Sequence, residues 1–278
     1  MEINIPLTCG ATLEIDSRRG SSTNYPTARL QKGFALLQDG RSLIEEGIGF
    51  GLPVVKRGNQ TVFPGHMELQ MKANDLTCVL DVQYQMDLEE RIALPGKRRI
   101  ESKLVYQLKN GLADLHRRIP VLRGFLTAAS NRLRRLLAME TIFAEVTSFG
   151  TITADFTIYS NLGRIFFKYD TSRLRKNALT EIIIMNEQGA RTFDVYQDSM
   201  GTYLKADEIG TWDEVKAEEA TFISVIDHLA FSLKQVEGAR LFRGRELIGS
   251  RLAWTGFGYS LPATAKTFCY ELKIRRYP

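Results

Sequence analysis

The sequence predicts a mainly β protein, a large antiparallel β-sandwich with one kinked helix or helical hairpin inserted mid-chain. Three observations lead to this class. Apolar and polar residues alternate in many short segments, turn residues recur between these segments, and one long stretch has helical spacing instead. At 278 residues the chain is long enough to bury a large core, and we expect residues 1–278 to form a single β-rich domain.

The first β region spans residues 1–96 and is marked by period-two alternation. Asp39-Gly40, between two apolar runs, is a strong hairpin signal because both residues tolerate positive φ. Pro95-Gly96 ends the region. The expected strands are one or two within residues 1–16, then 43–53, 67–71 and 76–88.

The helical insert is expected at about residues 101–141, within a longer pattern that runs from Arg98 to Phe143. Leucines recur there at steps of three and four residues. Pro120 lacks a backbone donor and clashes with the preceding turn, so the helix should kink or break near it. Residues 97–135 carry eleven Lys or Arg against two acids, whereas the whole chain has a net charge of +5.

The second β region, residues 142–278, returns to alternation. Glu187-Gln188-Gly189 predicts a turn between two strands, and Thr211 with Glu214 predicts a short capped helix over 211–220. The expected strands are 142–146, 151–159, 164–169, 181–185, 191–197, 221–234, 239–248, 251–260 and 266–275. We expect one domain because no Pro/Gly/Ser-rich linker separates the two β regions.

This layout resembles large carbohydrate-active β-sandwiches and is supersandwich-like. The resemblance is one of architecture and rests on no shared motif. It therefore implies a fold and transfers no functional residue.

Several classes of protein are excluded or disfavoured by composition. We expect no signal peptide and no membrane-spanning helix, because neither an apolar leader nor an apolar run of about 20 residues is present. Three widely spaced cysteines predict reduced thiols and a cytoplasmic protein. No metal-ligand spacing, phosphate-binding loop or hydrolase elbow occurs, so neither a metal nor a cofactor is expected.

The leading hypothesis is that a concave sheet binds a carbohydrate-like or small polar ligand. Within about thirty residues lie five side chains suited to acid–base chemistry, and glycoside hydrolysis usually needs two carboxyl groups. The catalytic candidates are Glu45, Glu46, Glu68, Asp75 and His66. If the protein is an enzyme, these residues predict a hydrolase of glycosidic bonds. The structural alternative is that the acids merely solvate an outward face.

Glycines and aromatic residues complete this hypothesis. Gly47, Gly49 and Gly51 alternate with apolar residues, so on a strand they share a face without side chains. Either a ligand or packed aromatics from another layer must fill that face. Trp212, Trp254 and Tyr259 are the candidates for stacking on a sugar ring.

Two alternative functions remain open. The basic helix 101–141 is suited to an anionic partner, a membrane surface or nucleic acid, and the anion-binding candidates are Arg117, Arg118, Arg132, Arg134 and Arg135. Equally, the helix would dock on the acidic sheet of its own chain. The second alternative is a carrier that holds an apolar ligand inside a β-barrel.

Overall fold

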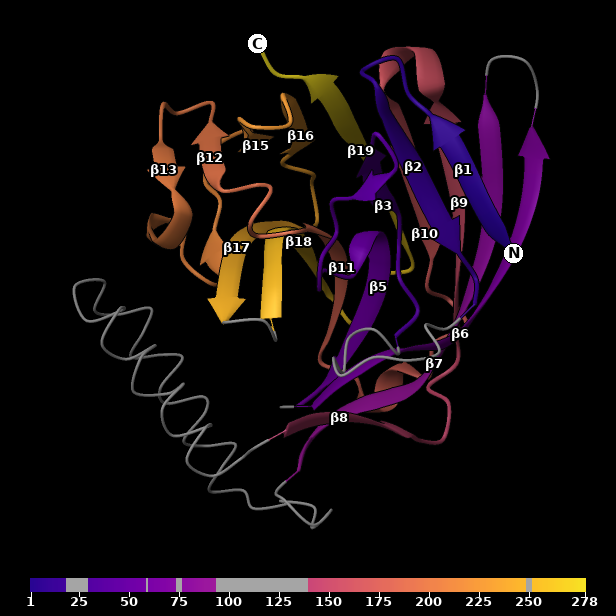
Figure 1. Cartoon of the computed structure of the whole chain (residues 1–278). Helices are drawn as coiled ribbons and strands as arrows, with labels where there is room; N and C mark the ends of the chain where they lie inside the picture. The colour runs from indigo at the N-terminus through magenta and orange to yellow at the C-terminus, as the bar shows by residue number, and fades with distance from the viewer. Residues whose placement is uncertain (19–29, 59, 74–76, 94–139, 249–251) are drawn as a thin grey trace.

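The computed structural model describes residues 1–18, 30–58, 60–73, 77–93, 140–248 and 252–278 (Figure 1). Antiparallel strands dominate these residues. The helical pieces among them are three short 3-10 turns, Ser160–Leu162, Lys176–Ala178 and Ala206–Glu208. The predicted mainly β class with a large antiparallel sheet is therefore confirmed. None of the residues in these ranges forms a helix long and apolar enough to cross a membrane.

The strands, in chain order, form two sheets. They are β1 (Glu2–Pro6), β2 (Ala11–Asp16), β3 (Ala35–Gln38), β4 (Arg41–Ser42), β5 (Gly49–Arg57), β6 (Gln60–Ala73), β7 (Cys78–Ala93), β8 (Glu140–Glu145), β9 (Thr151–Tyr159), β10 (Arg164–Asp170), β11 (Glu181–Gln188), β12 (Val195–Asp198), β13 (Tyr203–Lys205), β14 (Asp213–Glu214), β15 (Glu219–Ser224), β16 (Leu229–Lys234), β17 (Arg240–Ile248), β18 (Leu252–Pro262) and β19 (Thr267–Arg276).

Strands β1 to β4 make a small sheet, and the others make a 15-stranded sheet. Its order is β13-β12-β15-β16-β19-β10-β9-β7-β6-β5-β11-β18-β17-β14, and β8 pairs with β7 (Figure 1). Strands from before and after residues 94–139 share this sheet, because β7 pairs with β9 and β5 pairs with β11. Both of these long-range pairings are antiparallel.

The long hairpin of β6 and β7 bends the large sheet. Its register is irregular around Pro64, a residue that has no backbone N–H to donate to the ladder. The part of β6 before Pro64 pairs with β5, whereas the part of β7 near Tyr84 pairs with β9. The two halves of the sheet thereby become two layers of one sandwich.

Aromatic rings fill the space between the layers. Phe50 on β5 lies 5.0 Å from Phe231 on β16, and Phe257 on β18 lies 4.7 Å from Phe222 on β15, measured between ring centroids. These rings are fully buried. A core packed in this way gives no support to the hypothesis of an apolar-ligand carrier.

The small sheet adds to the layer that holds β5. Phe34, just before β3, contacts the ring of Phe156 on β9 at 5.6 Å. The side-chain amide of Gln188 donates to the Phe34 carbonyl at 3.0 Å and accepts from the Leu36 N–H at 3.1 Å. The predicted Asp39-Gly40 hairpin is confirmed between β3 and β4, and both residues have positive φ.

The inserted helix is not borne out by the described residues. Residues 101–139 of the predicted segment lie outside them, and the arginine candidates 117, 118, 132, 134 and 135 lie there too. Glu140 and Thr141 begin β8, where Phe143 packs edge-on against Phe63 at 5.4 Å. The helical prediction is wrong at this end because pairing with β7 overrides local spacing.

Two further expectations in the second β region are corrected. The short helix at 211–220 is wrong, since β14 and the start of β15 lie there. The single strand at 221–234 is instead the hairpin of β15 and β16. Its turn is held by the Ser224 hydroxyl, which donates to the Asp227 carboxylate at 2.9 Å and accepts the Asp227 N–H at 3.2 Å.

Candidate functional site

The glycine row predicted as a ligand slot is filled by packed protein. A side chain at Gly47 or Gly49 would meet backbone atoms of Gln188 or Gly33. At Gly51 a Cβ atom would lie 2.4 Å from Cε1 of Phe167, a ring of the facing layer. Of the two occupants that the sequence left open, the structure therefore shows packing.

Gly51 yields a stability prediction. Its φ is +79°, and its carbonyl accepts a hydrogen bond from the buried Tyr169 hydroxyl at 2.9 Å. We expect Gly51→Ala to lower the free energy of unfolding by about 2–4 kcal/mol, through backbone strain and overpacking together. Urea denaturation measures the loss.

Gly40 provides the matched control for this substitution. Its φ is +75°, but no atom lies within 4 Å of the position that a Cβ atom would take, so Gly40→Ala tests backbone strain alone. A loss in Gly51→Ala no larger than that in Gly40→Ala would contradict the close packing at β5.

Glu45, the first carboxylate candidate, acts as a structural clamp. It accepts the backbone N–H of Arg191 at 3.0 Å and pairs with the Arg191 guanidinium at 2.6 Å. This fastens the loop before β5 to the loop after β11. The oxygens of Glu45 are therefore occupied by the fold.

The candidates on β6 lie apart from the Glu46 carboxylate. The exposed His66 contacts Asp87 at 3.3 Å through Nδ1, and Glu68 is exposed. Among the residues that the structure describes, no hydrogen bond or ion pair joins His66 or Glu68 to Glu46. Asp75 lies outside those residues, so its role stays a prediction.

The sequence did not indicate Glu187, on β11, as a site residue, because its neighbours are typical of a turn. The turn prediction at 187–189 is wrong, since β11 continues through Gln188. The preceding residue, Asn186, points into the core, where its Oδ1 accepts from the Tyr270 hydroxyl at 2.8 Å. Because side chains alternate along a strand, Glu187 lies on the opposite, outer face of this layer. It is nonetheless only 5% exposed.

Lys32 and Glu46 adjoin in sequence the backbone groups that meet Glu187 at Ile48. The Ile48 N–H donates to Oε2 of Glu187 at 3.3 Å, and the Ile48 carbonyl accepts from Gly33 N–H at 2.8 Å. Lys32 precedes Gly33, and Glu46 lies two residues before Ile48. Oε2 of Glu46 is buried and has no hydrogen-bond partner among the described residues.

Trp254 and Glu246 extend this group across β18 and β17. They are directly opposite in the ladder, and Nε1 of Trp254 donates to Oε2 of Glu246 at 3.1 Å. The next residue, Thr255, is fully buried on the inner side, so Trp254 shares the outer face with Glu187. We call Lys32, Glu46, Glu187, Glu246 and Trp254 the acid–lysine cluster.

Glycines make room for the two tryptophans on this face. The far edge of the Trp254 ring would lie 2.7 Å from a Cβ at Gly244, and the Trp212 ring 2.3 Å from a Cβ at Gly258. Trp212 also stacks on Phe242, with centroids 5.3 Å apart. Both tryptophans predicted to bind ligand therefore lie flat over the β17–β18 strands.

The charges of the cluster are strongly perturbed. Burial raises the pKa of Glu187 to about 8; the Ile48 N–H and Lys32 oppose this rise, and Glu246 adds to it. Burial also raises the pKa of Glu46, and the positive charge of Arg191 is the main effect that opposes this rise. Burial lowers the pKa of Lys32, which Glu46 and Glu187 counteract. At neutral pH the cluster thus contains a protonated carboxyl group, and perturbed pKa values of this kind gather at functional sites.

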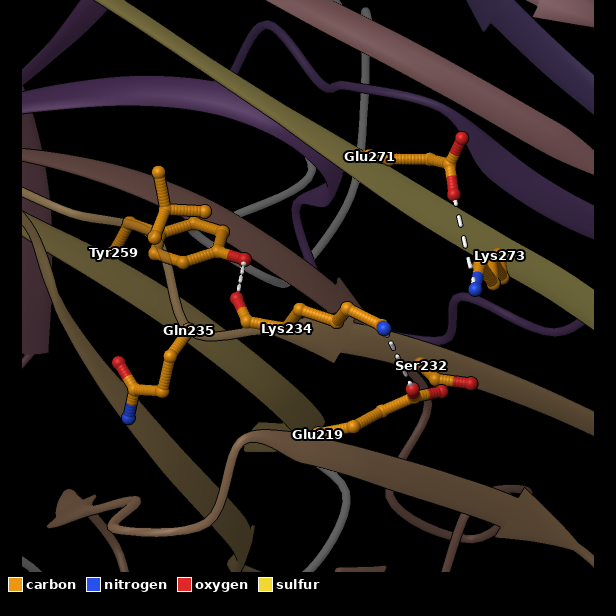
Figure 2. Close-up of a pocket in the computed structure, with 8 residues that line it drawn as sticks. Glu219, Ser232, Lys234, Gln235, Tyr259, Glu271 and Lys273 are labelled. Atoms are coloured by element: carbon orange, nitrogen blue, oxygen red, sulfur yellow. Dashed lines mark hydrogen bonds and ion pairs between the residues drawn. The ribbon is translucent and has the colours of Figure 1, made fainter. Parts of the chain in front are cut away.

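A separate hollow lies on the other layer. Its volume is about 240 Å³, and it is lined by Glu219, Ser232, Lys234, Gln235, Val236, Tyr259, Glu271 and Lys273. Figure 2 shows Lys234 directed at Glu219 (3.6 Å) and Lys273 at Glu271 (3.9 Å). These charges already pair with each other. The acid–lysine cluster is therefore the better candidate site.

Tyr259, the third aromatic candidate, belongs to this hollow and to the core. Its ring is fully buried against Tyr270, with centroids 4.8 Å apart. Its hydroxyl donates to the Lys234 carbonyl (Figure 2). The structure thus separates Tyr259 from Trp254.

No family model and no curated protein matches the chain. Solved structures do share its fold. The α-N-acetylgalactosaminidase NagBb from Bifidobacterium bifidum, in complex with Gal-NHAc-DNJ, has a TM-score of 0.51 at 10% identity, covering 99% of this chain and 36% of that one. Its ligand-free form has a TM-score of 0.50 at 8% identity, with the same coverage. A putative aldose 1-epimerase from Escherichia coli K12 has a TM-score of 0.44 at 8% identity, covering 99% and 100%.

The chain thus spans about a third of the length of the galactosaminidase chains it matches. At such low identity the likeness concerns the fold alone. It supports the predicted large β-sandwich.

Proposed function

We propose that the protein binds a carbohydrate-like ligand at the acid–lysine cluster, on the outer face of β11, β18 and β17. The observation that carries the proposal is Glu187, a carboxyl group that stays protonated near neutral pH on the same outer face as Trp254, whose indole N–H is bonded to Glu246. A shared fold does not by itself carry a function, so the proposal rests on these side chains.

The chemistry of the cluster suits a sugar. An indole ring offers a flat apolar surface for the C–H face of a pyranose, and carboxyl groups hydrogen-bond to its hydroxyl groups. Protonated Glu187 can donate such a bond, and Oε2 of Glu46, which lacks a partner in the described part of the chain, can accept one. Lys32 adds further donors.

The reaction that this arrangement fits is hydrolysis of a glycosidic bond. A retained proton at pH 7 is what a general acid needs in order to protonate a leaving oxygen. Glu187 takes that role, and Glu46 is the second carboxyl group. This differs from the pair expected from the sequence, because Glu45 is engaged with Arg191 and Glu68 is exposed on β6.

Titration calorimetry with a panel of monosaccharides and glycosides tests the binding. We expect Trp254→Ala and Glu46→Gln each to weaken the affinity about tenfold or more, the scale of one stacking contact or one charged hydrogen bond. Glycoside hydrolysis, followed by release of a chromogenic aglycone, tests the reaction with the same variants.

Glu68→Gln is the matched control, since it makes the same chemical change on an exposed strand position. It should leave affinity unchanged. A parent protein that binds no sugar, or a loss in Glu68→Gln equal to that in Glu46→Gln, would refute the proposed site.

A further inference from the structure

Lys32 differs from exposed, paired lysines such as Lys72 and Lys216. Its ammonium group makes no hydrogen bond and no ion pair within the part of the chain that the structure describes, although it is half-buried. Lys72 pairs with Asp81 at 2.7 Å and Lys216 with Glu214 at 2.9 Å, both at exposed positions. Lys32 is thus a shielded amine that no carboxylate among the described residues holds by direct contact.

The backbone fixes the position of Lys32. Phe34 and Phe50 exchange two backbone hydrogen bonds, of 2.9 and 2.8 Å, beside the bond from Gly33 to Ile48. A Cβ atom at Gly33 would lie 2.0 Å from the Phe50 carbonyl oxygen, so the two segments touch. The backbone next to Lys32 is therefore held firmly beside β5, which pairs with β11, the strand that carries Glu187.

We propose that Lys32 is a nucleophile that forms an imine with the carbonyl group of an open-chain sugar held at the acid–lysine cluster. The proposal rests on the proposed function for its ligand and adds a covalent step that hydrolysis does not require. Two hydrogen bonds carry it, from Gly33 to the Ile48 carbonyl and from the Ile48 N–H to Glu187, because they hold the segment of Lys32 beside Glu187, together with Oε2 of Glu46, which has no partner among the described residues.

The step balances with the groups present. The lone pair of the Lys32 Nζ atom attacks the carbonyl carbon, and the carbonyl oxygen takes the proton of Glu187 to give a carbinolamine. The nitrogen proton passes to a carboxylate, the hydroxyl group leaves as water after protonation, and a C=N bond forms. One amine and one carbonyl group thereby give one imine and one water, with no change of oxidation state.

The electrostatics agree with this role. Burial lowers the pKa of Lys32, so a larger share of the amine is neutral than for a lysine in water. Each unit of such a shift raises the neutral fraction about tenfold. The Glu187 carboxylate formed after proton transfer would stabilise the positively charged iminium form.

Reductive trapping tests the proposal directly. The intact protein is incubated near pH 7 with glycolaldehyde, a minimal hydroxyaldehyde, and sodium cyanoborohydride, and the modified lysines are located by peptide mass spectrometry. We expect Lys32 to be alkylated about ten times faster or more than Lys216, the exposed control. Lys32→Arg should abolish the fast phase and leave the slow modification of surface lysines unchanged.

Two results would count against distinct claims. Equal rates at Lys32 and Lys216, in a protein that binds a sugar by calorimetry, would overturn the nucleophile and leave the proposed function standing. Fast modification of Lys32 in a protein that binds no sugar would support the amine assignment and refute the proposed ligand. Trapping of D-galactose at Lys32, lost when a non-reducing methyl galactoside replaces it, would confirm the open-chain form as the one captured.

Discussion

Above about pH 8, replacing Glu187 with glutamine is expected to raise the free energy of unfolding by about 3–5 kcal/mol. The same change should weaken sugar binding and any hydrolysis, since glutamine cannot supply an acidic proton. One substitution would thus stabilise the fold and impair the site, as happens where an active site holds a group in an unfavourable environment.

The sign and size follow from the two pKa values. The pKa of Glu187 is about 8 in the folded protein, against an ordinary value of 4.5. Between these values the folded protein binds a proton that the unfolded chain has lost, so the free energy of unfolding falls as pH rises from 4.5 to about 8. The difference between these two pKa values, at about 1.4 kcal/mol for each pKa unit, sets the expected change in the free energy of unfolding. Glutamine removes this dependence and keeps an oxygen for the Ile48 N–H.

Urea denaturation from about pH 4.5 to 9 measures this effect, since the two proteins should agree at the acidic end and diverge with rising pH. Glu68→Gln serves as the exposed control and should follow the parent throughout. Parallel curves for the parent and Glu187→Gln would show that the Glu187 carboxyl group is not protonated in the folded state.

Loss of Glu89 is expected to destabilise the fold. Glu89 lies on β7 and is 1% exposed. It pairs with Arg57 at 3.0 Å and with Arg91 at 2.7 Å. Glu89→Ala leaves Arg57 (41% exposed) and Arg91 (20% exposed) without their carboxylate, and solvent partly screens these two charges, so the free energy of unfolding should fall by about 1.5–3 kcal/mol.

The same strand offers a control for this prediction. Asp81 pairs with Lys72 at 2.7 Å, and both side chains are exposed. Exposed pairs contribute about 0–1 kcal/mol, so Asp81→Ala should change stability little. Equal losses for the two variants, measured by urea denaturation at pH 7, would contradict the importance of burial at Glu89.

Strands that alternate strictly could be predicted well. Residues 151–159 and 164–169 were expected as strands and form β9 and β10, with Phe156 and Phe167 buried and their polar neighbours outside. The Asp39-Gly40 turn was equally predictable, because its signal lies in two adjacent residues. In these segments local pattern and tertiary packing favour the same conformation.

The candidate site was only partly predictable. Glu46 and Trp254 were expected in it, but Glu187, Lys32 and Glu246 were not. Glu187 stands beside Gln188 and Gly189, so its sequence context is that of a turn, and only pairing with β5 and β18 extends the strand through it. An acid two residues after the apolar run 182–185 was the one available signal.

The sequence by itself determined the β class, most strand positions and the inward face of each strand, because these depend on alternation within a few residues. Tertiary structure decided which faces meet. It packed Phe167 against Gly51, engaged Glu45 with Arg191, and bonded Glu187 to the Ile48 N–H. Those outcomes depend on ladder register between segments more than a hundred residues apart, and on the burial that follows from it.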